Sequence, residues 1–210
     1  LLPHVFVRPG EPYALGVGLG ARAHYSAWAL PAAELGKPDA QWRQVFLDDA
    51  KNKSGGDIRN GQLYAISDQS ANGEIVRYDL ASGERHVLRP TGTRPIESLG
   101  VARDGLYFRE RNGVYTSLKR IGYDGSGEIE IRFPRKGVPS PAGEAYTDPT
   151  LDGAVVLLDS WNEPESDFQV SGDGSVREFG LSAPLKGFDL SRLHARDLVA
   201  TSHDGTRVPL

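Results

Sequence analysis

The sequence contains neither cysteine nor methionine. Without cysteine, structural disulfides and thiolate metal sites are excluded. Methionine is missing even at position 1, where the chain begins Leu1-Leu2-Pro3, so we expect the native start of the protein to lie upstream. The sequence lacks a charged segment followed by an apolar one, which is the pattern of a signal peptide. The sequence therefore leaves the compartment open between cytoplasm and periplasm.

Long apolar runs and concentrated positive charge are also missing. No run approaches the roughly 18 apolar residues that a membrane-spanning helix needs. The formal net charge is −4, and the lysines and arginines are scattered along the chain instead of forming a stripe. We therefore expect neither a membrane nor a nucleic acid as a partner.

Turn-forming residues, in contrast, are plentiful. Glycine and proline account for 25 and 14 of the 210 residues, while hydrophobic residues still make up 39%. A chain with so many turn residues and enough apolar residues for a core is typical of an all-β protein, not of a disordered one.

The most informative pattern is an internal repeat. A turn followed by an apolar strand occurs three times, as Asn60-Gly61-Gln62-Leu63-Tyr64, Asp104-Gly105-Leu106-Tyr107-Phe108 and Asp152-Gly153-Ala154-Val155-Val156. A second motif, an aspartate in a polar turn, recurs in step with the first, at Asp79, Asp124 and Asp173. A period of roughly 40–50 residues built from short strands is the signature of a β-propeller blade.

We therefore expect a partial β-propeller of about four antiparallel blades. These blades cover residues 1–48, 49–90, 91–136 and 140–182. Two strands matter below: Ile129–Phe133 is expected to complete the third blade, and the very apolar Ala154–Leu158 is expected to be covered on both faces. Residues 188–210 do not continue the pattern and are expected to form an exit strand that is cut off at Leu210.

No catalytic or metal-binding motif stands out. Gly16–Gly20 resembles part of a dinucleotide fingerprint, but its spacing is wrong and no βαβ unit follows, which favours a strand and a turn. The G-x-S-x-G nucleophile elbow is absent. The polar turns at Asp124 and Asp173 lack the alternating oxygen ligands of a calcium loop. No zinc-binding pattern is formed by the five histidines, His4, His24, His86, His194 and His203. We therefore expect no catalytic, cofactor-binding or metal-binding residue in this chain.

The C-terminal residues 196–210 carry a resemblance to a known family. They read RDLVATSHDGTRVPL, which is similar to the T-S-x-D-G-T-x-[VI]-P junction between the propeller and the peptidase domain of the prolyl oligopeptidase family. Leu63–Asp68 with the Asn72-Gly73 turn resembles a blade of that family. Ser160–Ser166 resembles its S-F-x-x-P segment, with Trp161 in place of phenylalanine. The resemblance runs along all 210 residues, and the junction is its most specific part.

The resemblance implies that the propeller and the catalytic residues lie in separate domains. In that family the propeller has seven blades, is not fastened by strand exchange, and is followed by a peptidase domain that holds the Ser, Asp and His of the catalytic triad. Residues 1–187 would then be the last four blades, and residues 188–210 would lead into the missing α/β-hydrolase domain. His203 and Asp204 would belong to the junction and not to the triad. The chain alone would be inactive, whereas the parent would cleave short peptides after proline.

The resemblance also implies partners. These are the N-terminal blades and the peptidase domain of the longer protein, together with a short peptide substrate. An arc of four blades would expose apolar faces near its N-terminus and near residues 140–182, so we expect the isolated chain to self-associate.

Two other functions stay open. One is a free-standing propeller that acts as a binding or scaffold module. The other is an enzyme with its site in the propeller channel, such as a glycosidase or a lactonase. A channel enzyme needs carboxylates or metal ligands that converge from several blades. The scattered candidates are Asp48, Asp49, Asp57 and Asp148.

Overall fold

The computed structural model describes residues 2–21, 23–53, 56–140, 147–180, 187, 190 and 192–209. Nearly all regular structure in these ranges is antiparallel sheet, as four sheets of four strands and one hairpin. The helical elements described are two single 3-10 turns, Ala32–Glu34 and Asp48–Ala50. The predicted all-β class is confirmed.

Each four-stranded sheet is made of strands that are consecutive in the sequence. The first holds β1 (Leu2–Phe6), β2 (Tyr13–Leu19), β3 (Ser26–Pro31) and β4 (Arg43–Phe46). The second holds β5 (Asp57–Arg59), β6 (Gln62–Ser67), β7 (Glu74–Asp79) and β8 (Arg85–Arg89). The third holds β9 (Ile96–Ala102), β10 (Gly105–Asn112), β11 (Tyr115–Ile121) and β12 (Ile129–Glu130). The fourth holds β13 (Val138–Ser140), β14 (Ala154–Asp159), β15 (Ser166–Val170) and β16 (Val176–Glu178), and a hairpin of β17 (Val199–Thr201) and β18 (Arg207–Pro209) follows.

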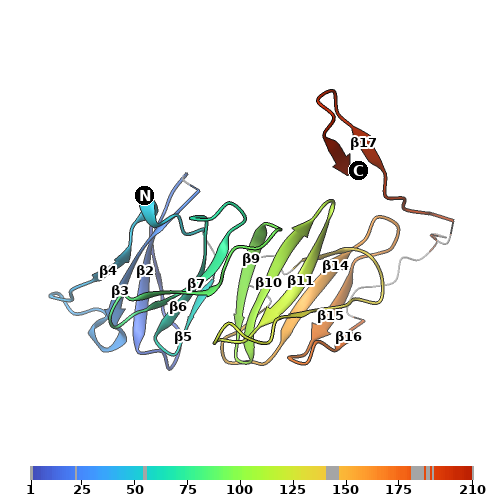
Figure 1. Ribbon diagram of the computed structural model, residues 1–210. Helices are drawn as coiled ribbons and strands as arrows, with labels where there is room; N and C mark the ends of the chain where they lie inside the picture. The colour runs from blue at the N-terminus through green and yellow to red at the C-terminus, as the bar shows by residue number, and fades with distance from the viewer. Residues whose placement is uncertain are drawn as a thin grey trace.

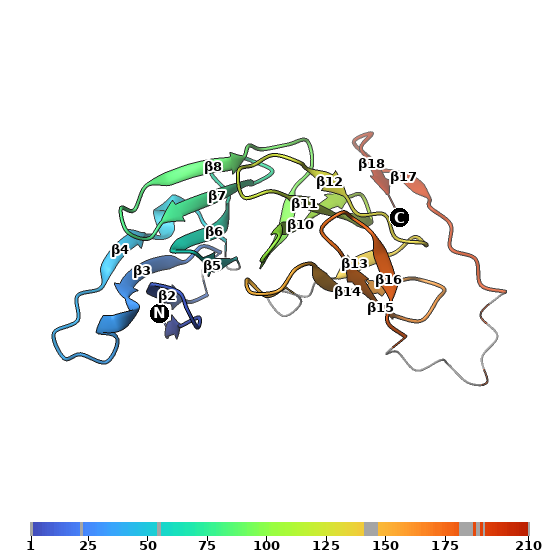
Figure 2. The same ribbon diagram turned by 90° about the horizontal axis from the view of Figure 1, so that it is seen from below.

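The four sheets stand side by side in chain order (Figure 1). Figure 2 shows that they follow an open arc, with β5 on the concave side of the second sheet and β8 on its convex side. The C-terminal hairpin stands apart from the sheets in Figure 1. Four-stranded sheets arranged around a common centre are the blades of a β-propeller, so the chain forms an arc of four blades.

Three hydrophobic cores hold the arc together, one between each pair of neighbouring blades. Strand β6 shows how one sheet serves two cores. Leu63 and Ala65 pack in the first core, whereas Tyr64 and Ile66 pack in the second. Successive side chains of a strand point to opposite faces, so a sheet covered on both faces has strands that are apolar without interruption.

The repeated tyrosines lie between blades, as the repeat predicts. Tyr64 is 5% exposed and belongs to the second core, and Tyr107 is 1% exposed and belongs to the third. The ring of Tyr64 lies 4.9 Å from that of Tyr123. The hydroxyl of Tyr107 donates a hydrogen bond to Asp104 at 3.0 Å. These aromatic residues therefore build the contacts between blades.

The repeated glycine turn joins one blade to the next. Gly61 and Gly153 have φ angles of 70° and 81°, in the left-handed region that favours glycine. The carboxylate of Glu11, in the first blade, accepts the N–H of Gly61 at 2.8 Å. The carboxylate of Asp104, in the third blade, accepts the N–H of Gly153 at 2.9 Å. The sequence period therefore coincides with a contact between adjacent blades.

A charged network also crosses from the second blade to the third. The guanidinium of Arg89 pairs with Glu110 and, at 2.8 Å, with Glu128. Lys119 pairs with the same two carboxylates at 2.8 and 2.7 Å. The side chain of Glu110 is only 3% exposed, and Arg89 lies over the ring of Phe108. Each buried charge therefore has partners of opposite sign, as burial of charge requires.

The structure corrects several details of the sequence analysis. The fourth sheet begins at Val138, so the expected boundary at residue 140 falls inside β13. Strand β14 is buried on one face only, and Val155 and Leu157 on its other face are partly exposed because no described sheet packs against them. The exit segment contains a hairpin, β17 paired with β18, where a single strand was expected; Leu210 lies outside the described residues. The grouping of residues 1–187 as blades of a larger ring, and of 188–210 with a peptidase domain, stays a prediction.

Candidate functional site

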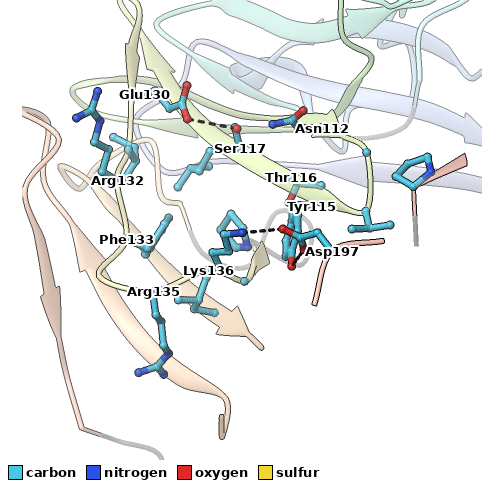
Figure 3. A pocket seen from close by; sticks show the side chains of 18 of the residues that line it. Asn112, Tyr115, Thr116, Ser117, Glu130, Arg132, Phe133, Arg135, Lys136 and Asp197 are labelled. Atoms are coloured by element: carbon cyan, nitrogen blue, oxygen red, sulfur yellow. Dashed lines mark hydrogen bonds and ion pairs between the residues drawn. The ribbon is translucent and has the colours of Figure 1, made fainter. Parts of the chain in front are cut away.

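A groove of about 690 Å³ opens between the third blade, the fourth blade and the C-terminal segment (Figure 3). It starts where the chain leaves the third sheet. Strand β12 pairs only with Lys119 and Arg120, and one further bond joins the N–H of Ile131 to the carbonyl of Leu118 at 2.9 Å. Residues 132–137 then lead away to β13. The groove is the wedge between β11 and this departing segment.

The lining of the groove is apolar on the side of the inter-blade core and polar towards the C-terminal segment. Its apolar residues include Leu118, Ile131, Phe133, Pro139 and Leu158. Three of these, Leu118, Ile131 and Phe133, belong to or pack against the third core. The groove is therefore continuous with the packing between the third and fourth blades.

Asp197 brings the C-terminal segment to the groove. Its carboxylate accepts hydrogen bonds from the Tyr115 hydroxyl at 2.6 Å and from the Lys136 ammonium at 2.7 Å, and Figure 3 shows both side chains directed towards it. These bonds lower the pKa of Asp197, and Asp197 in turn raises the pKa of Lys136 and of Tyr115. We call Tyr115, Lys136 and Asp197 the clasp, because they tie the C-terminal segment to the blades.

Arg135 fixes the other wall of the groove to the fourth blade. Its guanidinium donates to the Ser166 hydroxyl and lies 3.1 Å from the Glu163 carboxylate. It also sits over the ring of Phe168. The segment that leaves β12 is thus held away from β11 by contacts with the next blade, which keeps the groove open.

The residues of the junction motif form local hydrogen bonds within a turn. The Asp204 carboxylate accepts the N–H of Thr206 at 2.9 Å, and the Ser202 hydroxyl lies 3.3 Å from Nδ1 of His203. All lie in the connection between β17 and β18, where Gly205 has a φ of 83°. Hydrogen bonding to the backbone of the turn lowers the pKa of Asp204. Nothing in this geometry makes Ser202 a nucleophile, because its histidine neighbour is exposed and has no orienting carboxylate among the described contacts.

The other candidates do not form a common site. Gly16–Gly20 is strand β2 and the turn after it, as the spacing predicts. Asp57 pairs with Arg8. Asp148 accepts hydrogen bonds from Thr150. These hydrogen bonds, together with the charge of Arg8, lower the pKa of Asp148. Asp48 and Asp49 lie in the second 3-10 turn. Among the residues that the structure describes, no three His, Cys, Asp or Glu side chains gather to hold a metal ion. No helix in the described ranges is long and apolar enough to cross a membrane.

The sequence analysis did not find the groove. It is formed by two segments that separate, and no motif of chemistry-bearing residues marks such a place. The available signal was the pair Pro134 and Gly137, which follow the apolar alternation of Ile129–Phe133 and indicate that the chain leaves the sheet.

Comparison with known proteins places this arc in a class of fold. No family model matches the sequence, and no curated protein matches it. Among solved structures, the arc matches the propeller region of prolyl oligopeptidases and of oligopeptidase B. The fold that the resemblance implied is therefore confirmed.

Three of these structures illustrate the likeness. One comes from a study of two prolyl endopeptidases and the role of inter-domain dynamics in their catalysis and specificity, with a TM-score of 0.79 and 14% identity. Prolyl oligopeptidase B from Galerina marginata gives 0.77 and 12%, and oligopeptidase B from Leishmania major gives 0.75 and 14%. Each match covers 99% of this chain, but the chain spans only 30%, 30% and 31% of the respective proteins.

Proposed function

We propose that this chain is the non-catalytic, substrate-selecting propeller portion of a serine peptidase of the prolyl oligopeptidase type. The observation that carries the proposal is the fold match, which covers 99% of this chain and only 30% of a larger peptidase. The junction-like sequence of residues 196–210 supports it, since it lies where a peptidase domain would follow the last blade.

In such a protein the part played by these blades is steric. A ring completed by further blades would cover the active site, admit short peptides and exclude folded proteins. Attack by serine, general base catalysis by histidine and stabilisation in an oxyanion hole would all occur outside these 210 residues. The clasp would set the direction in which the chain leaves the third and fourth blades for the peptidase domain.

The proposal includes self-association of the isolated chain. Strand β1 exposes Leu2 and Val5 by 69% and 53%, beside an apolar groove lined by Trp28 and Trp42. Exposed apolar surface of this kind is usually covered in soluble proteins. Sedimentation should therefore show oligomers, whereas a strict monomer at high concentration would favour a free-standing binding module.

The test compares two polypeptides. One is the complete reading frame that contains this sequence, and the other is the 210-residue chain alone. The complete polypeptide should cleave a short peptide after proline and spare a folded protein with an exposed proline, and the chain alone should show no turnover. Turnover by the chain alone that is lost in Ser202→Ala or His203→Ala would overturn the proposal, as would a complete polypeptide without peptidase activity.

A further inference from the structure

Strand β11 has an unpaired edge where it borders the groove. On its outer side it pairs with β12 only at Lys119 and Arg120. On its inner side it pairs with β10 along its whole length, from Tyr115 to Ile121. Over residues 115–117, therefore, no described strand pairs with its outer side. Unpaired strand edges present rows of backbone donors and acceptors that another extended chain can use.

The direction of these backbone groups follows from one hydrogen bond. The carbonyl of Leu118 accepts the N–H of Ile131, so Leu118 directs its backbone groups away from β10. In an antiparallel strand the N–H and C=O of one residue point to the same side, and the side alternates from residue to residue. Thr116 therefore presents both its N–H and its C=O to the groove.

Thr116 is one of the residues that line the groove, as Figure 3 shows. Its hydroxyl oxygen is buried within the protein and is not part of the accessible wall. Thr116 therefore offers the groove two backbone groups, its N–H and its C=O.

We propose that this groove binds a short extended peptide segment as an added strand along β11. Only a polypeptide supplies alternating donors and acceptors at the spacing of a strand, about 3.3 Å per residue. Three edge residues and the size of the wedge set the length at about three to five residues. The peptide side chains that face inwards meet Ile131, Phe133 and Leu158, so the segment carries apolar residues at alternate positions.

This binding requires no peptidase domain, and it is tested on the 210-residue chain, so its failure leaves the proposed function untouched. The probe is the capped peptide acetyl-Thr-Val-Thr-Val-Thr-amide, titrated into the ¹⁵N-labelled chain. We expect a dissociation constant on the order of 0.1–1 mM, because so short a ladder adds few hydrogen bonds. The amide signal of Thr116 should shift most. No binding at a peptide concentration of about ten times that range would overturn the proposal.

Two substitutions at one position separate the backbone from the side chain. Thr116→Pro removes the outward N–H, and because this N–H faces away from β10 the existing ladder is kept. It should weaken binding by about fivefold or more. Thr116→Val keeps the N–H and replaces only the buried hydroxyl with a methyl group, so it should leave binding nearly unchanged. Equal affinity of Thr116→Pro and the unmodified chain would contradict an added strand.

A second measurement stands even where Thr116→Pro fails to fold. Two versions of the probe peptide are N-methylated at adjacent residues, and both are titrated into the unmodified chain. In an added strand only one of the two amides faces β11, so one version should bind at least about fivefold more weakly than the other. Equal binding of both would refute strand pairing. Displacement of self-associated chains by the peptide, seen in sedimentation, would assign the groove to a second copy and overturn the peptide assignment.

Discussion

The repeated turn at Gly153 allows a test of the close approach between this turn and Val170 on the neighbouring strand. Gly153 and Gly10 have the same φ of 81°, so alanine meets the same left-handed conformation at both positions. Around Gly10 a Cβ would meet nothing within 4 Å, whereas at Gly153 it would lie far inside van der Waals distance of the carbonyl oxygen of Val170. The two substitutions therefore differ mainly in this one contact.

The loss in the free energy of unfolding can be worked out separately for each substitution. Placing alanine in the left-handed region costs about 1–2 kcal/mol, part of which is offset by the smaller entropy of the unfolded chain. For Gly10→Ala we expect a loss of about 1 kcal/mol in the free energy of unfolding. At Gly153 the turn must also move away from Val170, which strains the first ladder pair, Ala154 with Val170. It also weakens the bond to Asp104. For Gly153→Ala we therefore expect about 3 kcal/mol or more.

The assay is urea unfolding followed by far-ultraviolet circular dichroism, with the m-value checked between variants. Because repeat arrays can unfold in parts, hydrogen exchange of the β14 amides should be measured as well. It should rise in Gly153→Ala and stay unchanged in Gly10→Ala. Losses that agree within about 0.5 kcal/mol, the usual scatter of surface substitutions, would refute the argument that the close approach to Val170 decides the effect.

Further predictions concern a core, a turn and the clasp. Tyr107→Ala should lower the free energy of unfolding by about 3–5 kcal/mol, because the ring is buried between blades; calorimetry or urea unfolding measures this, and a loss below about 0.5 kcal/mol would contradict the burial. Hydrogen bonds from Gln62 and Ser82 lower the pKa of Asp79 to about 2, below the unfolded value. Its contribution to stability is thus present above about pH 4 and is lost as pH falls towards 2, and Asp79→Asn should flatten this part of the stability-versus-pH curve. Asp197→Asn should weaken the clasp and speed trypsin cleavage after Arg196 by about two- to fivefold, whereas an equal effect of a turn-preserving Asp204→Asn would show that the clasp holds nothing.

The sequence predicts those parts of the fold that repeat. The steps from Gly61 to Gly105 and Gly153 predict the blades. The apolar run Ala154–Leu158 does not predict two covered faces, because one face of β14 is partly exposed. Strand β13 was missed because Pro139 interrupts a strand pattern. The five-residue strand expected at Ile129–Phe133 is only two residues long, because contacts with the fourth blade draw the following chain away.

The groove could not be predicted from the sequence, because it also depends on contacts with the fourth blade. Whether Arg135 binds Ser166 or stays in solvent depends on where the fourth blade lies, and no local propensity encodes that. Thr116 reads as an ordinary strand residue. Its outward backbone groups become significant only once the departure of the chain after Ile131 is known.

Each of the four blades is built from four strands in succession, and this has a consequence for how the chain can be divided. A break between β8 and β9 would leave all backbone pairs of the four sheets intact, since no ladder crosses that point. The two pieces would meet mainly through side chains, in the second core and in the pairs that Arg89 makes with Glu110 and Glu128. A backbone hydrogen bond from the N–H of Ile96 to the carbonyl of Asn72 adds to these contacts. Such pieces are suited to reassemble from separate polypeptides, and a whole blade can be duplicated or lost in evolution without any strand having to find a new neighbour.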